Sequence, residues 1–234
     1  MPGFEEIYNC HADKYDALIN HEDYQENFSK FLLQNVDWMG KKVIEAGAGT
    51  GRVTRIYAAL ADKIFAADRS EHMLLKARLN LGAFSDKISY GIYENLNLDQ
   101  IPFKADIVIE GWSFGHTVED KPDNIPETVE SLMLTCKKLL RPGGQIIIIE
   151  TLGTGVTESG APDKTLAQFY LMLEEKYSFK KNIISTDYKF PSAEEAADVA
   201  GFFFGDDLGN RIRTEKFTII PEFTGIWIYN STGS

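Results

Sequence analysis

The chain has only two cysteines, Cys10 and Cys136, among its 234 residues. Two cysteines make neither a disulfide framework nor a set of metal ligands, so we expect no bound metal. The longest apolar run, at residues 146–149, is far too short to span a bilayer. The sequence does not open with a basic segment followed by an apolar one, which a secretory signal requires. These features favour a cytoplasmic protein that does not act on a membrane.

Positive charge is also scarce. Lysine and arginine number 24 against 35 acidic residues, which gives a net charge of −11 at pH 7. Such a surface repels the phosphates of nucleic acids, so we do not expect a nucleic-acid partner. The densest basic cluster is Lys137, Lys138 and Arg141. It lies at a predicted helix C-terminus, where the helix dipole alone favours cations. Nothing in the sequence indicates an oligomeric state.

Apolar strands alternate with helices through the first 150 residues. Buried strands are predicted at residues 42–47, 63–68, 87–91, 105–111 and 145–150. Helices are predicted at residues 51–61, after Ser70, and at 124–140. Strands that are apolar on both faces and joined by helices form a parallel sheet covered on both sides. Ligands of such α/β sheets bind beyond the carboxyl ends of the strands.

We expect the whole chain to form one domain with four parts. Residues 1–38 have helical spacing and are predicted to form an N-terminal cap. Residues 39–150 are the ligand-binding core. The strand–helix alternation then stops, so residues 151–191 are predicted to be an inserted lid beside the strand ends. Residues 192–234 are predicted to supply a closing helix and a hairpin that turns at Pro221–Glu222.

The first predicted strand runs into the glycine-rich stretch "VIEAGAGTGRVT", residues 43–54. Glycine is entropically costly in an ordered chain, so Gly47, Gly49 and Gly51 indicate a tight turn that a ligand approaches. A strand, a glycine turn and a helix N-terminus present backbone N–H groups to an anionic group. Dinucleotide loops read Gly-x-Gly-x-x-Gly. Here one residue separates the last two glycines, which weakens the prediction of a nicotinamide cofactor.

This stretch resembles the first motif of class I S-adenosylmethionine-dependent methyltransferases. The segments "IFAADRSEHML", "ADIVIEGWSFGH" and "LLRPGGQIIIIE" resemble later motifs of that class in the same order. The resemblance covers residues 40–150 and is nearest to small-molecule enzymes of the ubiquinone and menaquinone methyltransferase type. It implies S-adenosyl-L-methionine as cofactor. It also implies a Rossmann-like α/β sheet of seven mostly parallel strands, with helices on both faces and an antiparallel C-terminal strand.

The resemblance also implies residues that hold the adenosine part of the cofactor. Asp68 is expected to accept hydrogen bonds from both ribose hydroxyls, as an acid does at this place in dinucleotide folds. Arg69 and Met73 are expected to flank the adenine, with methionine as a soft apolar face. Where the class often has an acid beside the adenine, this chain has Ile92. Backbone groups of the next two residues, Tyr93 and Glu94, are expected to replace that contact.

Further cofactor residues are implied around the glycine loop. Tyr15 resembles a tyrosine that closes over the cofactor carboxylate in relatives, although a core aromatic on an amphipathic helix fits equally well. A ring of four carboxylates suits a cationic ligand, and its members are Glu45, Asp68, Glu94 and Glu110. With the loop itself, these candidates are Glu45, Gly47, Ala48, Gly49, Thr50, Gly51 and Glu110.

His116 is the candidate catalytic residue, because it follows a predicted strand and its pKa range suits proton abstraction. A hydrogen-bonded loop histidine with no catalytic role is the alternative. Several aromatic residues are candidates for an acceptor pocket, with simple packing as the alternative: Trp112, Phe114, Phe169, Tyr170 and Tyr188.

The leading hypothesis is an enzyme that transfers a methyl group from S-adenosylmethionine to an O, N or C nucleophile of a small molecule. A non-catalytic S-adenosylmethionine-binding protein on the same fold is an alternative, because a fold does not prove turnover. A nicotinamide-dependent oxidoreductase is a third hypothesis, disfavoured by the glycine spacing.

Overall fold

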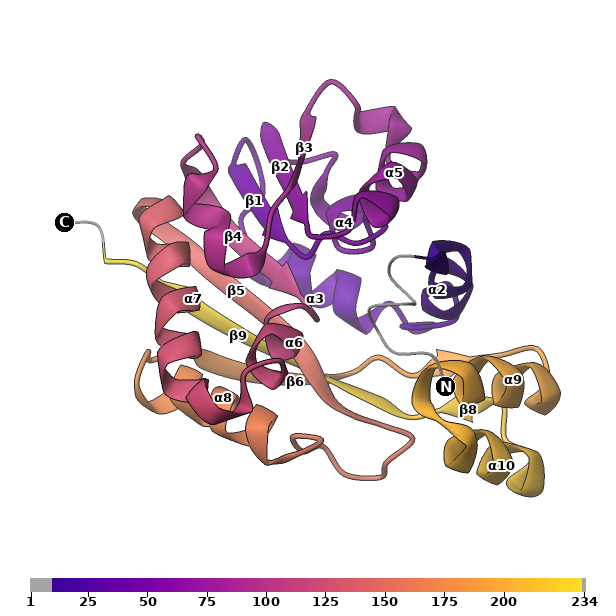
Figure 1. Ribbon diagram of the computed structural model, residues 1–234. Helices are drawn as coiled ribbons and strands as arrows, with labels where there is room; N and C mark the ends of the chain where they lie inside the picture. The colour runs from indigo at the N-terminus through magenta and orange to yellow at the C-terminus, as the bar shows by residue number, and fades with distance from the viewer. Residues whose placement is uncertain (1–9, 233–234) are drawn as a thin grey trace.

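Seven strands form one sheet in a computed structural model that describes residues 10–232. Their order across the sheet is β3-β2-β1-β4-β5-β9-β6 (Figure 1). The strands are β1 Lys42–Ala46, β2 Lys63–Asp68, β3 Ile88–Ile92, β4 Ala105–Gly111, β5 Leu140–Thr154, β6 Lys180–Ser185 and β9 Glu222–Asn230. Strands β1 to β5 pair in parallel. Strand β9 runs antiparallel to both β5 and β6. The predicted seven-stranded, mostly parallel sheet is confirmed.

Helices cover both faces of the sheet (Figure 1). One face is covered by α6 Phe114–Glu119, α7 Ile125–Leu139 and α8 Lys164–Glu175. The other is covered by α3 Asn27–Asn35, α4 Thr54–Tyr57 and α5 Glu71–Asn80. Helix α7 shows why a helix packs on the sheet. Its apolar stripe, which is buried against the sheet, consists of Val129, Leu132, Met133 and Cys136. Three short 3-10 helices, η1 Gly82–Phe84, η2 Asn95–Gln100 and η3 Pro122–Asn124, lie in the connections.

A separate cap lies beyond one end of the sheet (Figure 1). It consists of α2 Ala12–Ile19, α9 Ala193–Phe204, α10 Asp206–Glu215 and a two-stranded sheet of β7 Tyr188–Lys189 and β8 Ile219–Ile220. The cap has its own apolar core, in which Leu18 of α2 packs with Ala200 of α9 and Ile212 of α10. Segments far apart in sequence therefore meet here.

The predicted division of the chain after residue 150 is wrong. Residues 151–191 do not form a lid outside the sheet, because α8 packs on the sheet and β6 is its edge strand. Residues 192–204 do not close the sheet, because the apolar side chains of α9 pack within the cap. Strands β8 and β9 do not form a hairpin, since β8 pairs with β7 in the second sheet. The change of sheet falls at Pro221, which has no N–H for a ladder.

The predicted N-terminal cap is also divided between two places. Only α2 belongs to the cap. Helix α3 packs Phe28 and Leu32 on the main sheet, next to α4. The first nine predicted cap residues lie outside the described part of the chain.

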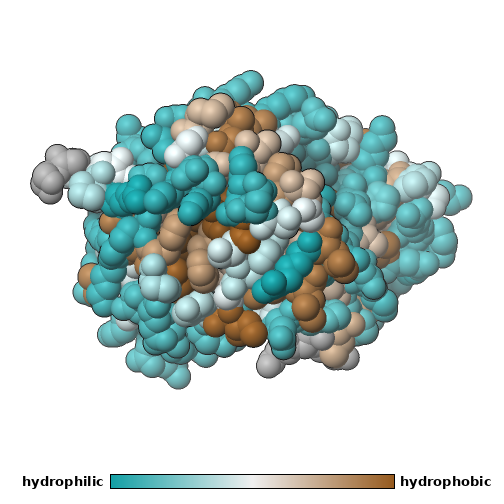
Figure 2. Space-filling view, turned by 90° about the horizontal axis from the view of Figure 1, so that it is seen from above, coloured by the Kyte–Doolittle hydropathy of each residue, from teal (hydrophilic) through white to brown (hydrophobic). Residues whose placement is uncertain are grey.

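The surface is mostly hydrophilic. Seen from above, hydrophilic residues cover much of the molecule, and hydrophobic residues gather toward the middle of this face (Figure 2). Within residues 10–232, no helix has the length and apolar character needed to cross a membrane.

Two neighbouring leucines of α3 test the packing of this helix on the sheet. Leu32 is 0% exposed and Leu33 is 45% exposed. Leu32→Ala should lower the free energy of unfolding by about 2–5 kcal/mol, because it leaves a cavity. Leu33→Ala should change it by less than about 0.5 kcal/mol. Denaturant titration of both variants measures this, and equal effects would contradict the placement of α3.

Candidate active site

The turn after β1 is held in a conformation that favours glycine. Gly47, Gly49 and Gly51 have φ angles of +63°, +53° and +88°, a region that other residues rarely adopt. Close packing adds a second requirement. A Cβ atom at Gly47 would overlap the Ser113 side chain, and one at Gly51 would lie 2.6 Å from Leu81 Cδ1. At Gly49 the nearest side-chain atom would be 3.6 Å away, so this glycine leaves space beside the backbone.

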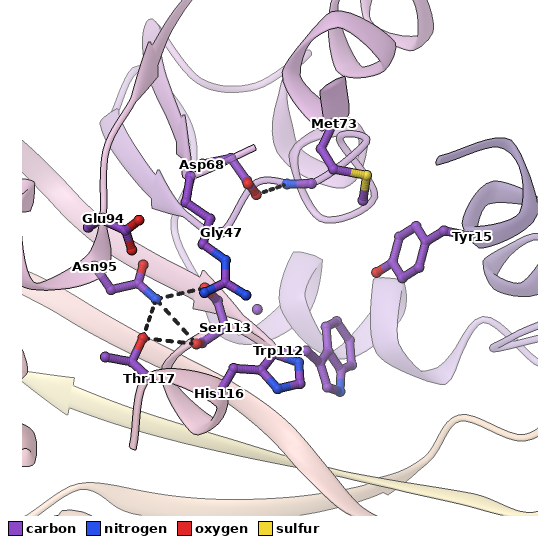
Figure 3. Close-up of a pocket in the computed structure, with 13 residues that line it drawn as sticks. Tyr15, Gly47, Asp68, Met73, Glu94, Asn95, Trp112, Ser113, His116 and Thr117 are labelled. Carbon is purple, nitrogen blue, oxygen red and sulfur yellow. Dashed lines mark hydrogen bonds between the residues drawn. The ribbon is translucent and has the colours of Figure 1, made fainter. Parts of the chain in front are cut away.

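Asp68, the last residue of β2, connects this turn to the next helix. Its Oδ2 accepts a hydrogen bond from Gly49 N–H at 2.8 Å (Figure 3). Its Oδ1 accepts one from Ser70 N–H at 2.8 Å. Burial raises the pKa of this carboxyl above its usual range, and the two N–H groups oppose the shift. A carboxylate oxygen can accept more than one hydrogen bond. Asp68 can therefore hold the turn and accept from a ligand.

A pocket opens in front of these two turns (Figure 3). Seven of the predicted cofactor residues line it: Tyr15, Gly47, Gly49, Asp68, Arg69, Met73 and Glu94. Tyr15 reaches it from the cap helix α2, and Met73 reaches it from α5. The guanidinium of Arg69 lies 3.6 Å from the carboxylate of Asp120, just after α6. Ser70 caps α5, the helix predicted to follow it, by accepting from Met73 N–H at 3.3 Å.

The opposite wall of the pocket contains residues that were not predicted. Asn95 Nδ2 donates to Ser113 Oγ and to Thr117 Oγ1, each at 2.9 Å (Figure 3). Gly111, the last residue of β4, and Trp112, which was predicted for an acceptor pocket, complete this wall. Asn95, Ser113 and Thr117 follow β3 or β4, so their position after strand ends was the signal that could have identified them.

Glu45 does not lie in the pocket. Its side chain is buried beneath the glycine turn, where Thr54 Oγ1 donates to it at 2.7 Å and Tyr57 OH also donates to it. Burial raises its pKa to about 7. Glu45 therefore ties β1 to α4 within the protein.

Glu110 also does not line the pocket, because its carboxylate accepts hydrogen bonds from backbone N–H groups behind it. It accepts from Ser113 N–H at 3.1 Å, Phe114 N–H at 3.0 Å and Ile149 N–H at 3.1 Å. Burial raises its pKa to about 8. The predicted ring of four carboxylates thus reduces to Asp68 and Glu94 at the pocket.

The remaining predicted loop residues support the turn and are not among the residues that line the pocket. Ala48 N–H donates to Ala67 O at 3.0 Å, which joins the turn to β2. Thr50 is buried, and Gly51 packs against Leu81. Tyr93 packs its ring on Phe65 at 5.9 Å between centroids.

A second, larger cavity of about 530 Å³ adjoins the first pocket. Tyr15, Trp112 and His116 line both, so the two spaces meet at these side chains. Of the aromatic residues predicted to line an acceptor pocket, Trp112 and Tyr188 line this cavity. Phe114, Phe169 and Tyr170 lie in the apolar core under α6, α7 and α8 and do not line it.

His116 projects from α6 at the junction of the two spaces. Its Nδ1 lies 3.4 Å from Glu119 Oε2 on the same helix. The N-terminus of α6 is held by two buried carboxylates, since Glu150 Oε1 accepts from Gly115 N–H at 2.5 Å beside the Glu110 contacts. A histidine on a fixed helix at this junction can exchange a proton with a molecule in the larger cavity.

Comparisons with known proteins agree with this geometry. Residues 44–146 match the Methyltransf_12 family, described as a methyltransferase domain. An uncharacterized methyltransferase of Staphylococcus carnosus (strain TM300) is 29% identical over 154 residues, which are 64% of this chain and 68% of the relative. Demethylspheroidene O-methyltransferase of Rhodobacter capsulatus is 30% identical over 165 residues, which are 69% of this chain and 38% of the relative.

The fold is similar to solved methyltransferase structures. The DhpI–S-adenosylhomocysteine complex aligns with a TM-score of 0.60 and 16% identity, covering 97% of this chain and 94% of that one. The chain is therefore a methyltransferase, with the fold of the S-adenosylmethionine-dependent class. S-adenosylmethionine is the cofactor of that class, and the predicted enzyme type is confirmed.

Glu45 should make stability depend on pH. Its pKa is raised from 4.5 to about 7 in the folded protein, so the folded protein holds this proton more tightly than the unfolded chain does. The stability that protonated Glu45 contributes is complete below pH 4.5 and is lost as the pH rises through 7. Glu45→Gln keeps an acceptor for Thr54 and Tyr57 without this titration. Its stability relative to wild type should rise by about 3 kcal/mol across that window.

Denaturant titrations at several pH values measure this difference. Glu158→Gln, at an exposed position, is the control and should follow the wild-type curve. A Glu45→Gln curve parallel to wild type across the window would contradict the raised pKa.

Proposed function

We propose that the chain transfers a methyl group from S-adenosylmethionine to an O, N or C nucleophile of a small molecule. The observation that carries this proposal is the junction of two spaces at Tyr15, Trp112 and His116. One space adjoins the glycine turn and Asp68, and the other is large enough for a small molecule, within the roughly 300–1,000 Å³ typical of ligand sites.

The residues of the first pocket fit the cofactor. Asp68 keeps acceptor capacity for ribose hydroxyls beyond its two backbone partners. The missing side chain of Gly49 leaves room for the ligand beside the backbone. Met73 supplies an apolar face for the adenine, and Arg69 also lines this pocket. Tyr15 is positioned to close over the amino-acid end from the cap.

When bound, the cofactor supplies an electrophilic methyl group: the acceptor's lone pair forms the bond to the methyl carbon while the carbon–sulfur bond breaks and its electrons return to sulfur. The protein aligns the reactants and excludes water. Trp112 and Tyr15 form the walls at the junction. Where the acceptor is an O–H or N–H group, His116 is placed to take its proton.

The acceptor is proposed to be a small molecule. The second cavity is bounded by the cap, and the overall charge of −11 disfavours nucleic acid. A relative, demethylspheroidene O-methyltransferase, carries a small-molecule substrate in its name. The motifs favour the branch that includes ubiquinone and menaquinone methyltransferases. A protein that binds the cofactor without turnover is the competing function, and formation of S-adenosylhomocysteine with a pool of metabolites distinguishes the two.

Asp68→Ala tests the cofactor pocket. The variant should bind S-adenosylmethionine about 1.5–3 kcal/mol more weakly, the range for losing hydrogen bonds to a charged group. Isothermal titration calorimetry gives the affinity, and circular dichroism shows whether the variant is folded. Asp86→Ala, at an exposed position after η1, should bind like wild type. Unchanged affinity in folded Asp68→Ala would remove Asp68 from the site.

His116→Ala tests the proton acceptor. Turnover should fall by roughly 10²–10⁴, the contribution of a general base, while cofactor affinity stays at the wild-type value. His72→Ala, on the exposed side of α5, is the control. A loss of only a few-fold would assign His116 a structural role.

A further inference from the structure

One end of the second cavity is polar and buried. Glu22 follows α2, Arg52 follows the glycine turn, Tyr188 begins β7 and Glu222 begins β9. Four separate segments therefore bring their polar groups to one place, which we call the polar end. Glu22 is 9% exposed and Glu222 is 3% exposed.

The polar end has unused hydrogen-bonding capacity. Glu22 Oε1 pairs with Arg52 Nη2 at 2.5 Å, and Glu222 Oε1 accepts from Thr151 Oγ1 at 2.9 Å. The other oxygen of each carboxylate, Oε2, is buried and makes no hydrogen bond of normal geometry among the described residues, although Tyr188 lies beside Glu22 and Thr154 beside Glu222. Burying an unsatisfied acceptor destabilises the protein. Two such acceptors on the lining of one cavity indicate a ligand that donates hydrogen bonds.

The charges around the cavity indicate the sign of that ligand. Four carboxyl side chains line it: Glu22, Glu119, Glu150 and Glu222. Arg52 is the only lysine or arginine among the described residues of the lining. Its guanidinium forms an ion pair with Glu22 and stacks 3.8 Å from the Trp112 ring centroid, although its buried Nη2 makes no hydrogen bond of normal geometry among the described residues. A cation would stabilise ionised carboxylates on this lining, whereas an anion would favour their protonated forms.

The rest of the cavity is apolar. Its walls come from α2, α9, the loop after β5 and α8, and the side chains are Leu18, Ile19, Val156, Pro162, Leu166, Phe203 and Phe204. A ligand that fills this space needs an apolar or aromatic body.

We infer that the methyl acceptor is an amine with an apolar body, whose ammonium group is held between Glu22 and Glu222. This inference rests on the proposed function for the identity of the cavity as the acceptor site. The ammonium donates to the two Oε2 atoms, and the apolar body lies along the walls toward the cap. The ammonium is the recognition group, and the methylated atom is whichever nucleophile then reaches the junction at Trp112 and His116.

Binding should release a proton from Glu222. Burial, together with the charge of Glu22, raises its pKa to about 8, so it is largely protonated at pH 7. Arg52 opposes this shift, Tyr188 lies beside Glu22, and Asp187 accepts from the Glu222 N–H at 3.0 Å. An ammonium group favours the ionised carboxylate. Binding of a cation at pH 7 should therefore expel close to one proton.

Three probes of similar shape and different charge test the inference: phenethylamine, phenethyl alcohol and phenylacetate. Each is titrated by calorimetry into the full chain saturated with S-adenosylhomocysteine. The amine should bind at least about tenfold more tightly than the alcohol, and the alcohol more tightly than the carboxylate. Repeating the amine titration in buffers of different ionisation enthalpy measures the released proton, which the alcohol should not release.

Glu222→Gln is the informative variant, because its side-chain oxygen can still accept from Thr151. The preference for the amine over the alcohol should fall to less than about threefold, and proton release should disappear. Binding of the alcohol should be unchanged, which shows that the cavity is intact. Glu175→Gln, an exposed position on α8, is the matched control and should retain the full preference.

The outcomes separate this inference from the proposed function. Equal or tighter binding of phenylacetate, absence of binding by all three probes, or an unchanged amine preference in Glu222→Gln would overturn the inference. None of these results concerns turnover. Failure to bind S-adenosylmethionine or to form S-adenosylhomocysteine from it would overturn the proposed function, whatever the order of the probes.

Discussion

The carboxylate of Asp68 joins the two backbone turns from which the cofactor pocket is built. One oxygen binds Gly49 N–H after β1, and the other binds Ser70 N–H before α5. Strands β1 and β2 are paired neighbours, so parallel pairing already brings their carboxyl ends to the same edge of the sheet. The Asp68 contacts then set the path of both turns, and Met73 takes its place one helical turn beyond Ser70. The pairing of the strands sets where the two turns lie, and the Asp68 side chain sets their local conformation.

The parts that could be predicted from the sequence depend on local pattern. Apolar runs bounded by helices predict a parallel sheet because strands buried on both faces need apolar residues throughout. The glycines at positions 47 and 51 were recognisable because positive φ and close packing both require glycine there. Asp68 was recognisable because it ends a strand next to that turn. Each of these signals is carried by one element or by elements that follow each other along the chain.

The parts that were missed depend on contacts between distant segments. Glu45 and Glu110 also follow the strand pattern, yet Tyr57 and the Ile149 backbone turn their carboxylates inward. The sequence does not distinguish an acid at a strand end that faces a ligand from one that forms hydrogen bonds inside the protein. The cap brings α2 together with residues 186–221. Helical spacing predicts a helix, but it does not indicate against which core that helix will pack. The pairing of β9 with both β5 and β6 likewise joins segments that are distant in the sequence.

The position of β9 has a consequence for the order of synthesis. It lies between β5 and β6 in the sheet but is made after both. During synthesis on the ribosome, one edge of β5 therefore stays unpaired, and β6 has no neighbouring strand, until the whole cap segment has emerged. Open edges invite pairing with other chains, and non-local pairing is slow. The half of the sheet nearest β3 can assemble early, whereas the half that carries the cap closes only when β9 arrives. Nascent chains in this interval are the form most exposed to aggregation and to chaperone binding.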